Sequence, residues 1–120
     1  TQVIIISDTF TQFAAPLMKK LGWPTIFCNS LEVAEDGEIT GYRMRVENSK
    51  YSTVKALQSI GFETIASGDS HNDLGMILAA GEGCAVSTAR TAVKEAAKHI
   101  VGSYEEKGVI KALQELLKKQ

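Results

Sequence analysis

The chain has 120 residues, the size of one ordinary domain, and its hydrophobic fraction of 44% is typical of a globular protein. Thirteen basic and fourteen acidic side chains leave a net charge of −1, which argues against a nucleic acid or an anionic membrane as partner. No apolar run is long enough to span a membrane, and no signal peptide is recognisable. Cys28 and Cys84 stand in apolar runs, as expected of buried thiols in a reducing cytoplasm.

Short apolar runs alternate with segments of helical spacing along the chain. The predicted strands cover residues 3–6, 25–28, 63–67, 84–86 and 99–101. The predicted helices cover residues 10–21, 49–60, 74–80, 89–97 and 104–118. Residues 31–46 predict a β-hairpin, because Asp36-Gly37 is a strong turn signal between two strand-like runs.

This alternation predicts an α/β fold. Strands that alternate with helices form a doubly wound parallel sheet with helices on both faces, here a three-layer αβα core with a small β-hairpin. The sequence contains no repeat, low-complexity tract or linker, so we expect residues 1–120 to form a single domain. Because the first residue is Thr1 and not methionine, we also expect the chain to come from a longer protein.

The most informative segment is Gly68-Asp69-Ser70-His71-Asn72-Asp73, which lies between a predicted strand and a predicted helix. Open α/β sheets bind their ligands at the carboxyl ends of the strands, where Asp69 is expected. A carboxylate there suits a hard cation such as Mg²⁺. A structural alternative explains Ser70 and Asp73 equally well, because Ser-x-x-Asp is a capping pattern, but it leaves Asp69 unexplained.

Ser7-Asp8-Thr9 presents a similar situation directly after the first predicted strand. Ser7 and the nearby backbone amides could bind an anion at a helix N-terminus, or Ser7 or Thr9 could simply cap that helix. Lys50 stands near the start of its helix, where a cation opposes the helix dipole, so a ligand contact is plausible. A solvated Lys50 is the alternative, and Lys55 one turn later is a second candidate.

Two further groups are assigned no chemistry. His71 and His99 lack any metal-ligand spacing and are interpreted as structural or solvated. The methionines are interpreted as core residues.

Residues 6–10, Lys50 and residues 68–73 together resemble the second, third and fourth motifs of the haloacid dehalogenase (HAD) superfamily, in the correct order. The amino-acid sequence of several segments resembles the phosphoserine phosphatase branch of this superfamily, and within it the bifunctional phosphoserine phosphatase/homoserine phosphotransferase type. The segments that carry this finer resemblance are Ser7-Asp8-Thr9-Phe10, Pro16-Leu17-Met18, Leu21-Gly22, Leu31-Glu32 and Gly41-Tyr42-Arg43.

The resemblance implies a Mg²⁺-dependent phosphomonoester hydrolase of serine biosynthesis, cytoplasmic, with a small phosphorylated amino acid as substrate. Ser7, with Asp8 and Thr9, would bind the phosphoryl oxygens, and Lys50 would hold the phosphate as a point charge. Asp69 would ligate the metal. Asp73 would support the metal directly or through another group, and Asn72 would orient substrate or nucleophile.

The sequence departs from the family in one respect, because it contains no Asp-x-Asp motif after an apolar strand. In the family this motif carries the nucleophile on the central strand, and a cap domain separates it from the Ser7 motif. The resemblance therefore implies a HAD-like core whose central first strand is missing, inactive as this chain alone. Either the remaining strands close up in the order 2-1-3-4-5, or another copy or a complementing N-terminal segment fills the gap.

Two other classes of protein remain open at this point. A flavodoxin-like or receiver-like module would have the strand order 2-1-3-4-5, although a receiver requires an acidic pair where only Asp8 is present. A non-catalytic structural fragment is the second alternative.

Overall fold

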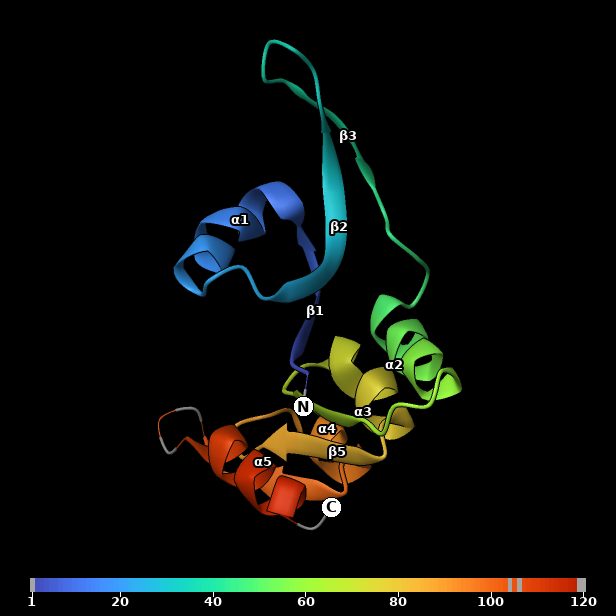
Figure 1. The fold of residues 1–120 in the computed structure, drawn as a ribbon, viewed down its shortest axis with the longest axis vertical. Helices are drawn as coiled ribbons and strands as arrows, with labels where there is room; N and C mark the ends of the chain where they lie inside the picture. The colour runs from blue at the N-terminus through green and yellow to red at the C-terminus, as the bar shows by residue number, and fades with distance from the viewer. Residues whose placement is uncertain (1, 104, 106, 119–120) are drawn as a thin grey trace. The chain divides into compact units, whose positions relative to one another are not determined.

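The computed structural model describes residues 2–103, 105 and 107–118, and it consists of two compact units, residues 1–49 and 50–120. Each unit has its own sheet (Figure 1).

The first unit contains three strands and one helix: β1 (Ile4–Phe10), α1 (Thr11–Lys20), β2 (Thr25–Val33) and β3 (Ile39–Arg43). Their order in the sheet is β1-β2-β3, with β1 parallel to β2 and β2 antiparallel to β3. The strand predicted at 25–28 and the first arm of the predicted hairpin are thus one continuous strand. This is possible because β2 pairs with β1 through its first half and with β3 through its second half.

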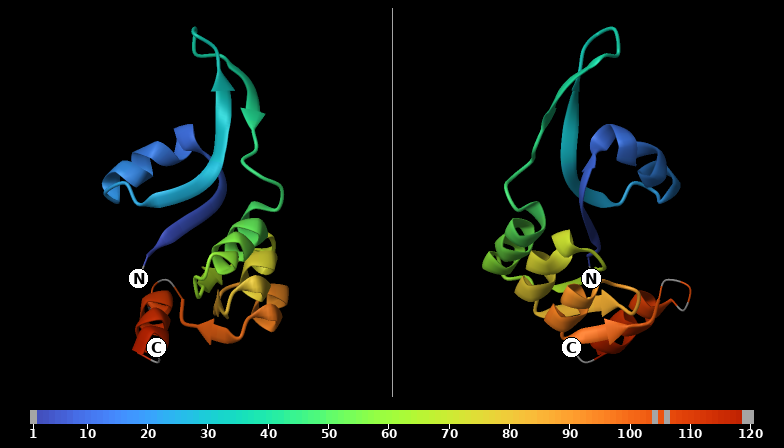
Figure 2. Two further views of the ribbon diagram at one scale, coloured as in Figure 1. Left: turned by 45° about the vertical axis from the view of Figure 1, so that its right-hand side comes forward. Right: turned by 180° about the vertical axis from the view of Figure 1, so that it is seen from behind.

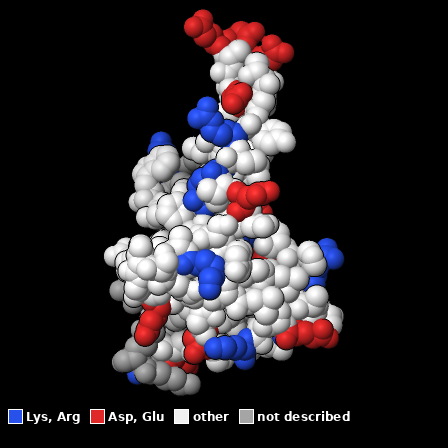
Figure 3. Space-filling view, turned by 90° about the vertical axis from the view of Figure 1, so that its right-hand side faces the viewer, with Lys and Arg blue, Asp and Glu red and all other residues white. Residues whose placement is uncertain are grey.

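The predicted hairpin turn is confirmed. The amide of Ala34 donates to the Glu38 carbonyl at 2.8 Å, and the Asp36 carboxylate accepts from the Glu38 amide at 2.9 Å. Gly37 has φ +91°, a conformation that glycine adopts without strain, which explains the Asp-Gly signal. Figure 2 shows β2 and β3 running side by side to this turn, and Figure 3 shows acidic side chains gathered at its tip.

The second unit contains a parallel sheet of order β4-β5-β6. Its strands are β4 (Ile65–Gly68), β5 (Glu82–Val86) and β6 (His99–Val101). Its helices are α2 (Ser49–Ser59), the 3-10 turn η1 (His71–Asp73), α3 (Leu74–Ala79), α4 (Thr91–Ala96) and α5 (Gly108–Lys118). The predicted start of the last helix, Tyr104, lies outside the described residues.

The central strand β5 separates two hydrophobic clusters, as expected of a strand with helices on both faces. Ala85 packs on one side with Ile77 of α3 and Val93 of α4. Cys84, whose side chain points the other way, packs with Val101 and with Leu116 of α5. Helices therefore cover both faces of this sheet.

The predicted α/β fold with parallel strands and a small hairpin is confirmed. The strands form two three-stranded sheets and not the single sheet of order 2-1-3-4-5 that closing the gap would produce. The parallel strand β1 is an edge strand of the first sheet, and β4 and β6 are the edge strands of the second. None of the described helices is long and apolar enough to cross a membrane.

Candidate functional site

The polar centre of the second unit is the Asp73 carboxylate, which is only 5% exposed although it belongs to the short turn η1. Its Oδ2 atom accepts hydrogen bonds from the backbone amides of Asp69 and Ser70, both at 3.0 Å. Its Oδ1 atom accepts from Lys50 Nζ at 2.5 Å. One side chain thus joins the end of β4, the start of η1 and the first turn of α2.

The capping interpretation of Asp73 is correct as geometry, because its carboxylate accepts from the Ser70 amide as a capping box requires. The Ser70 hydroxyl donates to the Asp69 carboxylate at 2.9 Å. Asp69 is exposed, and its carbonyl accepts from the Arg90 amide at 3.3 Å. Asp69 therefore presents a carboxylate to solvent at the carboxyl end of β4, where the sequence placed it.

Glycine at position 68 is required by this arrangement. A Cβ atom on Gly68 would lie 2.5 Å from Cγ and 2.6 Å from Oδ2 of Asp73, closer than any real Cβ contact. The carboxylate therefore packs directly against the backbone at the end of β4, and any side chain at residue 68 would displace it.

The charges of Lys50 and Asp73 stabilise each other. Their side chains are 13% and 7% exposed, so neither is well hydrated. Burial by itself raises the pKa of the Asp73 carboxyl, but the hydrogen bonds from Lys50, Ser70 and Asp69 outweigh burial and lower that pKa below its ordinary value. The alternative of a solvated Lys50 does not fit this burial, whereas Lys55 is exposed.

The first unit carries Ser7, Asp8 and Thr9, and here one expectation is wrong. Strand β1 continues through these residues to Phe10, and α1 begins only at Thr11 with no side-chain cap. Ser7 and Thr9 therefore do not cap α1, and their amides do not stand at a helix start. The Thr9 amide instead donates to Ser7 Oγ at 3.2 Å, within an irregular stretch of β1.

The structure thus brings Lys50, Asp69 and Asp73 together in the second unit, and Ser7, Asp8 and Thr9 in the first. Asn72 lies in η1 and is exposed, as is its neighbour His71. Among the described residues, no three His, Cys, Asp or Glu side chains gather as a metal site, so Asp69 would need further oxygen ligands to hold a cation.

Asn29 is a residue that the sequence reasoning missed. It lies in β2, is 2% exposed, and bonds through both ends of its side chain. A signal was available, since Asn29 is a fully polar residue near the middle of the otherwise mainly apolar run 25–33, and a buried amide needs specific partners.

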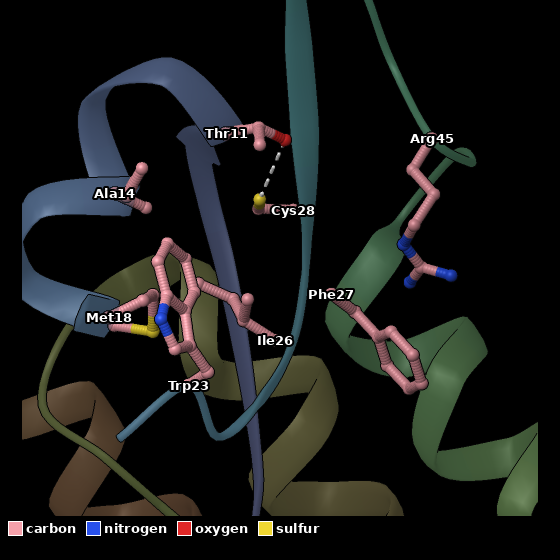
Figure 4. A pocket seen from close by; sticks show the side chains of 9 residues that line it. Thr11, Ala14, Met18, Trp23, Ile26, Phe27, Cys28 and Arg45 are labelled. Atoms are coloured by element: carbon pink, nitrogen blue, oxygen red, sulfur yellow. Dashed lines mark hydrogen bonds between the residues drawn. The ribbon is translucent and has the colours of Figure 1, made fainter. Parts of the chain in front are cut away.

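A small cavity of about 190 Å³ lies in the first unit, but it contains none of the predicted site residues. It is bounded mainly by apolar side chains between α1 and β2, among them Met18, Trp23 and Ile26 (Figure 4). Thr11 Oγ1 lies 3.6 Å from Cys28 Sγ at its edge. Its lining indicates loose packing rather than a polar binding site.

The profile of haloacid dehalogenase-like hydrolases matches residues 24–113, and the chain belongs to this family. The flavodoxin-like and receiver-like alternatives are therefore set aside. The phosphoserine phosphatase branch is supported by two curated relatives. A phosphoserine phosphatase, ThrH, of Pseudomonas aeruginosa is 38% identical over 94 residues, 78% of this chain and 46% of the relative. A phosphoserine phosphatase of Pseudomonas syringae pv. tomato is 42% identical over 76 residues, 63% of this chain and 32% of the relative.

Solved structures agree with this assignment. The crystal structure of a phosphoserine phosphatase in apo form covers 82% of this chain at 30% identity, with a TM-score of 0.68 and 52% of its own length matched. A probable phosphoserine phosphatase of Vibrio cholerae gives a TM-score of 0.66 at 32% identity, over 83% of this chain and 32% of its own. The chain therefore spans about half the length, or less, of these relatives.

Proposed function

We propose that this chain supplies the phosphate-holding and metal-binding portion of a Mg²⁺-dependent phosphatase that acts on a small phosphorylated amino acid such as phosphoserine. The observation that carries the proposal is the buried Lys50–Asp73 pair at the carboxyl end of β4, beside the exposed Asp69 carboxylate. A cytoplasmic role in serine biosynthesis follows from the same resemblance and is part of the proposal.

Lys50 is the cation of the site. Phosphoryl transfer depends on positioning and on neutralising the charge of the transferred group. The Asp73 carboxylate accepts a hydrogen bond from Lys50 Nζ and holds it in place, so the ammonium is oriented before a substrate arrives. In this proposal the function of Asp73 is to position Lys50.

Asp69 is the residue that would hold Mg²⁺ directly. Its carboxylate is exposed, and an oxygen donor of this kind fits a hard cation. The Asp73 oxygens already accept three hydrogen bonds, about three quarters of the capacity of a carboxylate. Asp73 therefore supports the site through Lys50 and the turn, and Mg²⁺ when bound would neutralise phosphoryl charge next to Asp69.

Ser7 and the segment 7–9 would bind phosphoryl oxygens, and Asn72 would orient the substrate or the nucleophile. Because Ser7 Oγ accepts from the Thr9 amide, its own hydroxyl hydrogen is available to donate. The proposal requires the two units to act together as one HAD-like core across residues 1–120. It also requires an Asp-x-Asp nucleophile, which the 120 residues do not contain, so the chain alone should not hydrolyse phosphoserine.

A chimera tests this proposal. The 94 residues of the Pseudomonas aeruginosa relative that align with this chain would be replaced by the corresponding segment of this chain. We expect the chimera to hydrolyse phosphoserine in the presence of Mg²⁺ and to lose most of this activity in the Lys50→Ala and Asp69→Ala variants.

Lys55→Ala is the matched control, because Lys55 lies on the same helix and is exposed. It should leave the activity of the chimera unchanged. A folded chimera whose activity is insensitive to both Lys50→Ala and Asp69→Ala would refute the assignment. Hydrolysis by the unmodified 120-residue chain above the level of its Asp69→Ala variant would refute the expectation that the nucleophile is supplied elsewhere.

A further inference from the structure

The backbone of β1 bulges where the candidate phosphate-binding residues lie. In the parallel pairing of β1 with β2, Ile6 is opposite Phe27 and Phe10 is opposite Asn29. Residues 7–9 of β1 therefore stand opposite a single residue of β2. Extra residues in one strand of a pair leave the regular ladder, and their peptide groups need other partners.

Asn29 supplies one of these partners. Its Nδ2 atom donates to the Asp8 carbonyl at 3.2 Å, while the amide on the other side of the same peptide bond, that of Thr9, donates to Ser7 Oγ. Both polar groups of the Asp8–Thr9 peptide are thus fixed. The orientation of this peptide decides whether Ser7 Oγ acts as acceptor and keeps its hydrogen for a ligand.

Asn29 is itself held firmly. Its Oδ1 atom accepts from the Arg45 amide at 2.9 Å, and its own carbonyl accepts from Thr11 Oγ1 at 3.1 Å. The Arg45 guanidinium lies 4.9 Å from the centre of the Phe27 ring and donates to Ser49 Oγ at 3.0 Å.

We propose that Asn29 is a positioning residue that fixes the bulge 7–9 for phosphate binding by holding the Asp8–Thr9 peptide. The inference rests on the proposed phosphate-binding role of Ser7. A buried amide with both ends bonded is suited to this task, because leaving either end unsatisfied is costly and its geometry is therefore well defined.

The experiment uses the 120-residue chain and inorganic phosphate, with backbone NMR signals as the measurement. In Asn29→Ala and Asn29→Asp we expect the Asp8 carbonyl carbon and the Thr9 amide to shift, and the dissociation constant for phosphate to rise about fivefold, the value of one typical hydrogen bond. Asn29→Asp retains an acceptor for the Arg45 amide, so the Arg45 signal should move less than in Asn29→Ala.

Gln12→Ala is the control for general destabilisation. Gln12 also bonds to β2 through both ends of its side chain, donating to the Leu31 carbonyl and accepting from the Leu31 amide, both at 3.0 Å. It lies outside the bulge, so its loss should leave phosphate affinity unchanged. Asn29 variants that bind phosphate like the wild type, or a Gln12→Ala variant weakened as much, would overturn the inference.

Failure of the underlying proposal gives a different result. If phosphate leaves the Ser7, Asp8 and Thr9 amides of the wild type unmoved, the phosphate-binding role of this segment is wrong. The role of Asn29 in phosphate positioning is then overturned with it. Asp8 and Thr9 signals that nevertheless shift in Asn29→Asp would identify Asn29 as a support of the backbone only.

Discussion

Breaking the Lys50–Asp73 pair should destabilise the second unit strongly. We consider Lys50→Met, Asp73→Asn and the double variant. Both side chains are nearly buried and their charged atoms are 2.5 Å apart, so each single variant leaves a charged group without its counter-charge and with little access to water. Removing one partner of such a pair costs about 3–5 kcal/mol, and we expect about 3 kcal/mol because Asp73 retains its two backbone amides.

The double variant should cost less than the sum of the two single variants, by about 2 kcal/mol, because the second substitution removes the group that the first leaves unpaired. Urea unfolding at pH 7 measures the free energy of unfolding of the wild type, the two single variants and the double variant. The transition should be followed through amide signals of β4 and β5, because the single tryptophan, Trp23, lies in the other unit.

The pH dependence provides an independent test. Because the native pKa of Asp73 lies below its unfolded value of about 4, the ionised carboxylate stabilises the fold fully above that pH. The contribution is lost as the pH falls from about 4 through the native pKa. Asp73→Asn should lack this part of the acid unfolding curve. The reasoning would be refuted if the losses of unfolding free energy in the two single variants simply added up in the double variant. An acid unfolding curve of Asp73→Asn that runs parallel to that of the wild type would refute it as well.

Three further outcomes are expected. Gly68→Ala should resemble loss of Asp73, with displaced Asp69 and Ser70 amide signals, because the added Cβ occupies the space of the carboxylate; unchanged amide signals would contradict this. Mg²⁺ should bind the 120-residue chain no more tightly than roughly millimolar by calorimetry, because Asp69 alone offers too few ligands; a micromolar constant would contradict this. Burial raises the pKa of the Cys84 thiol, and the neighbouring negative charge of Glu82 adds a smaller effect. Iodoacetamide at pH 7–8 should therefore modify the partly exposed Cys28 first, and Cys84 only on unfolding.

Much of the secondary structure was predictable because its signals are local. Gly22 and Gly61 follow the ends of α1 and α2 with φ of +79° and +96°, conformations that few other residues adopt. The helix ends were therefore predictable from the local sequence alone. The Asp36-Gly37 turn followed for the same reason, since it depends on residues adjacent in sequence.

The errors concern features that depend on distant partners. The sequence Ile6-Ser7-Asp8-Thr9 resembles the end of a strand, because polar residues follow apolar ones. The structure continues β1 through them because β2 and the buried Asn29 side chain supply hydrogen bonds from residues about twenty positions away. Local patterns cannot reveal such partners.

The candidate site was predictable only in part for a similar reason. Asp69 was recognisable from its place after a strand, and the capping pattern correctly indicated the bond between Asp73 and Ser70. The bond between Asp73 and Lys50 joins residues 23 positions apart, and this bond helps to lower the pKa of the Asp73 carboxyl. That information is carried by the packing of α2 against the turn.

The tight turn at Asp73 has a consequence for how freely the chain can change in length. The Asp73 carboxylate fixes the number of residues between β4 and α3, since it accepts from the amides of residues 69 and 70 and occupies the space that a Cβ atom on residue 68 would need. An inserted or deleted residue between positions 68 and 73 would break all of these bonds together. The exposed hairpin turn at Asp36 depends only on its own residues, so this is where the chain can accept an epitope or a label.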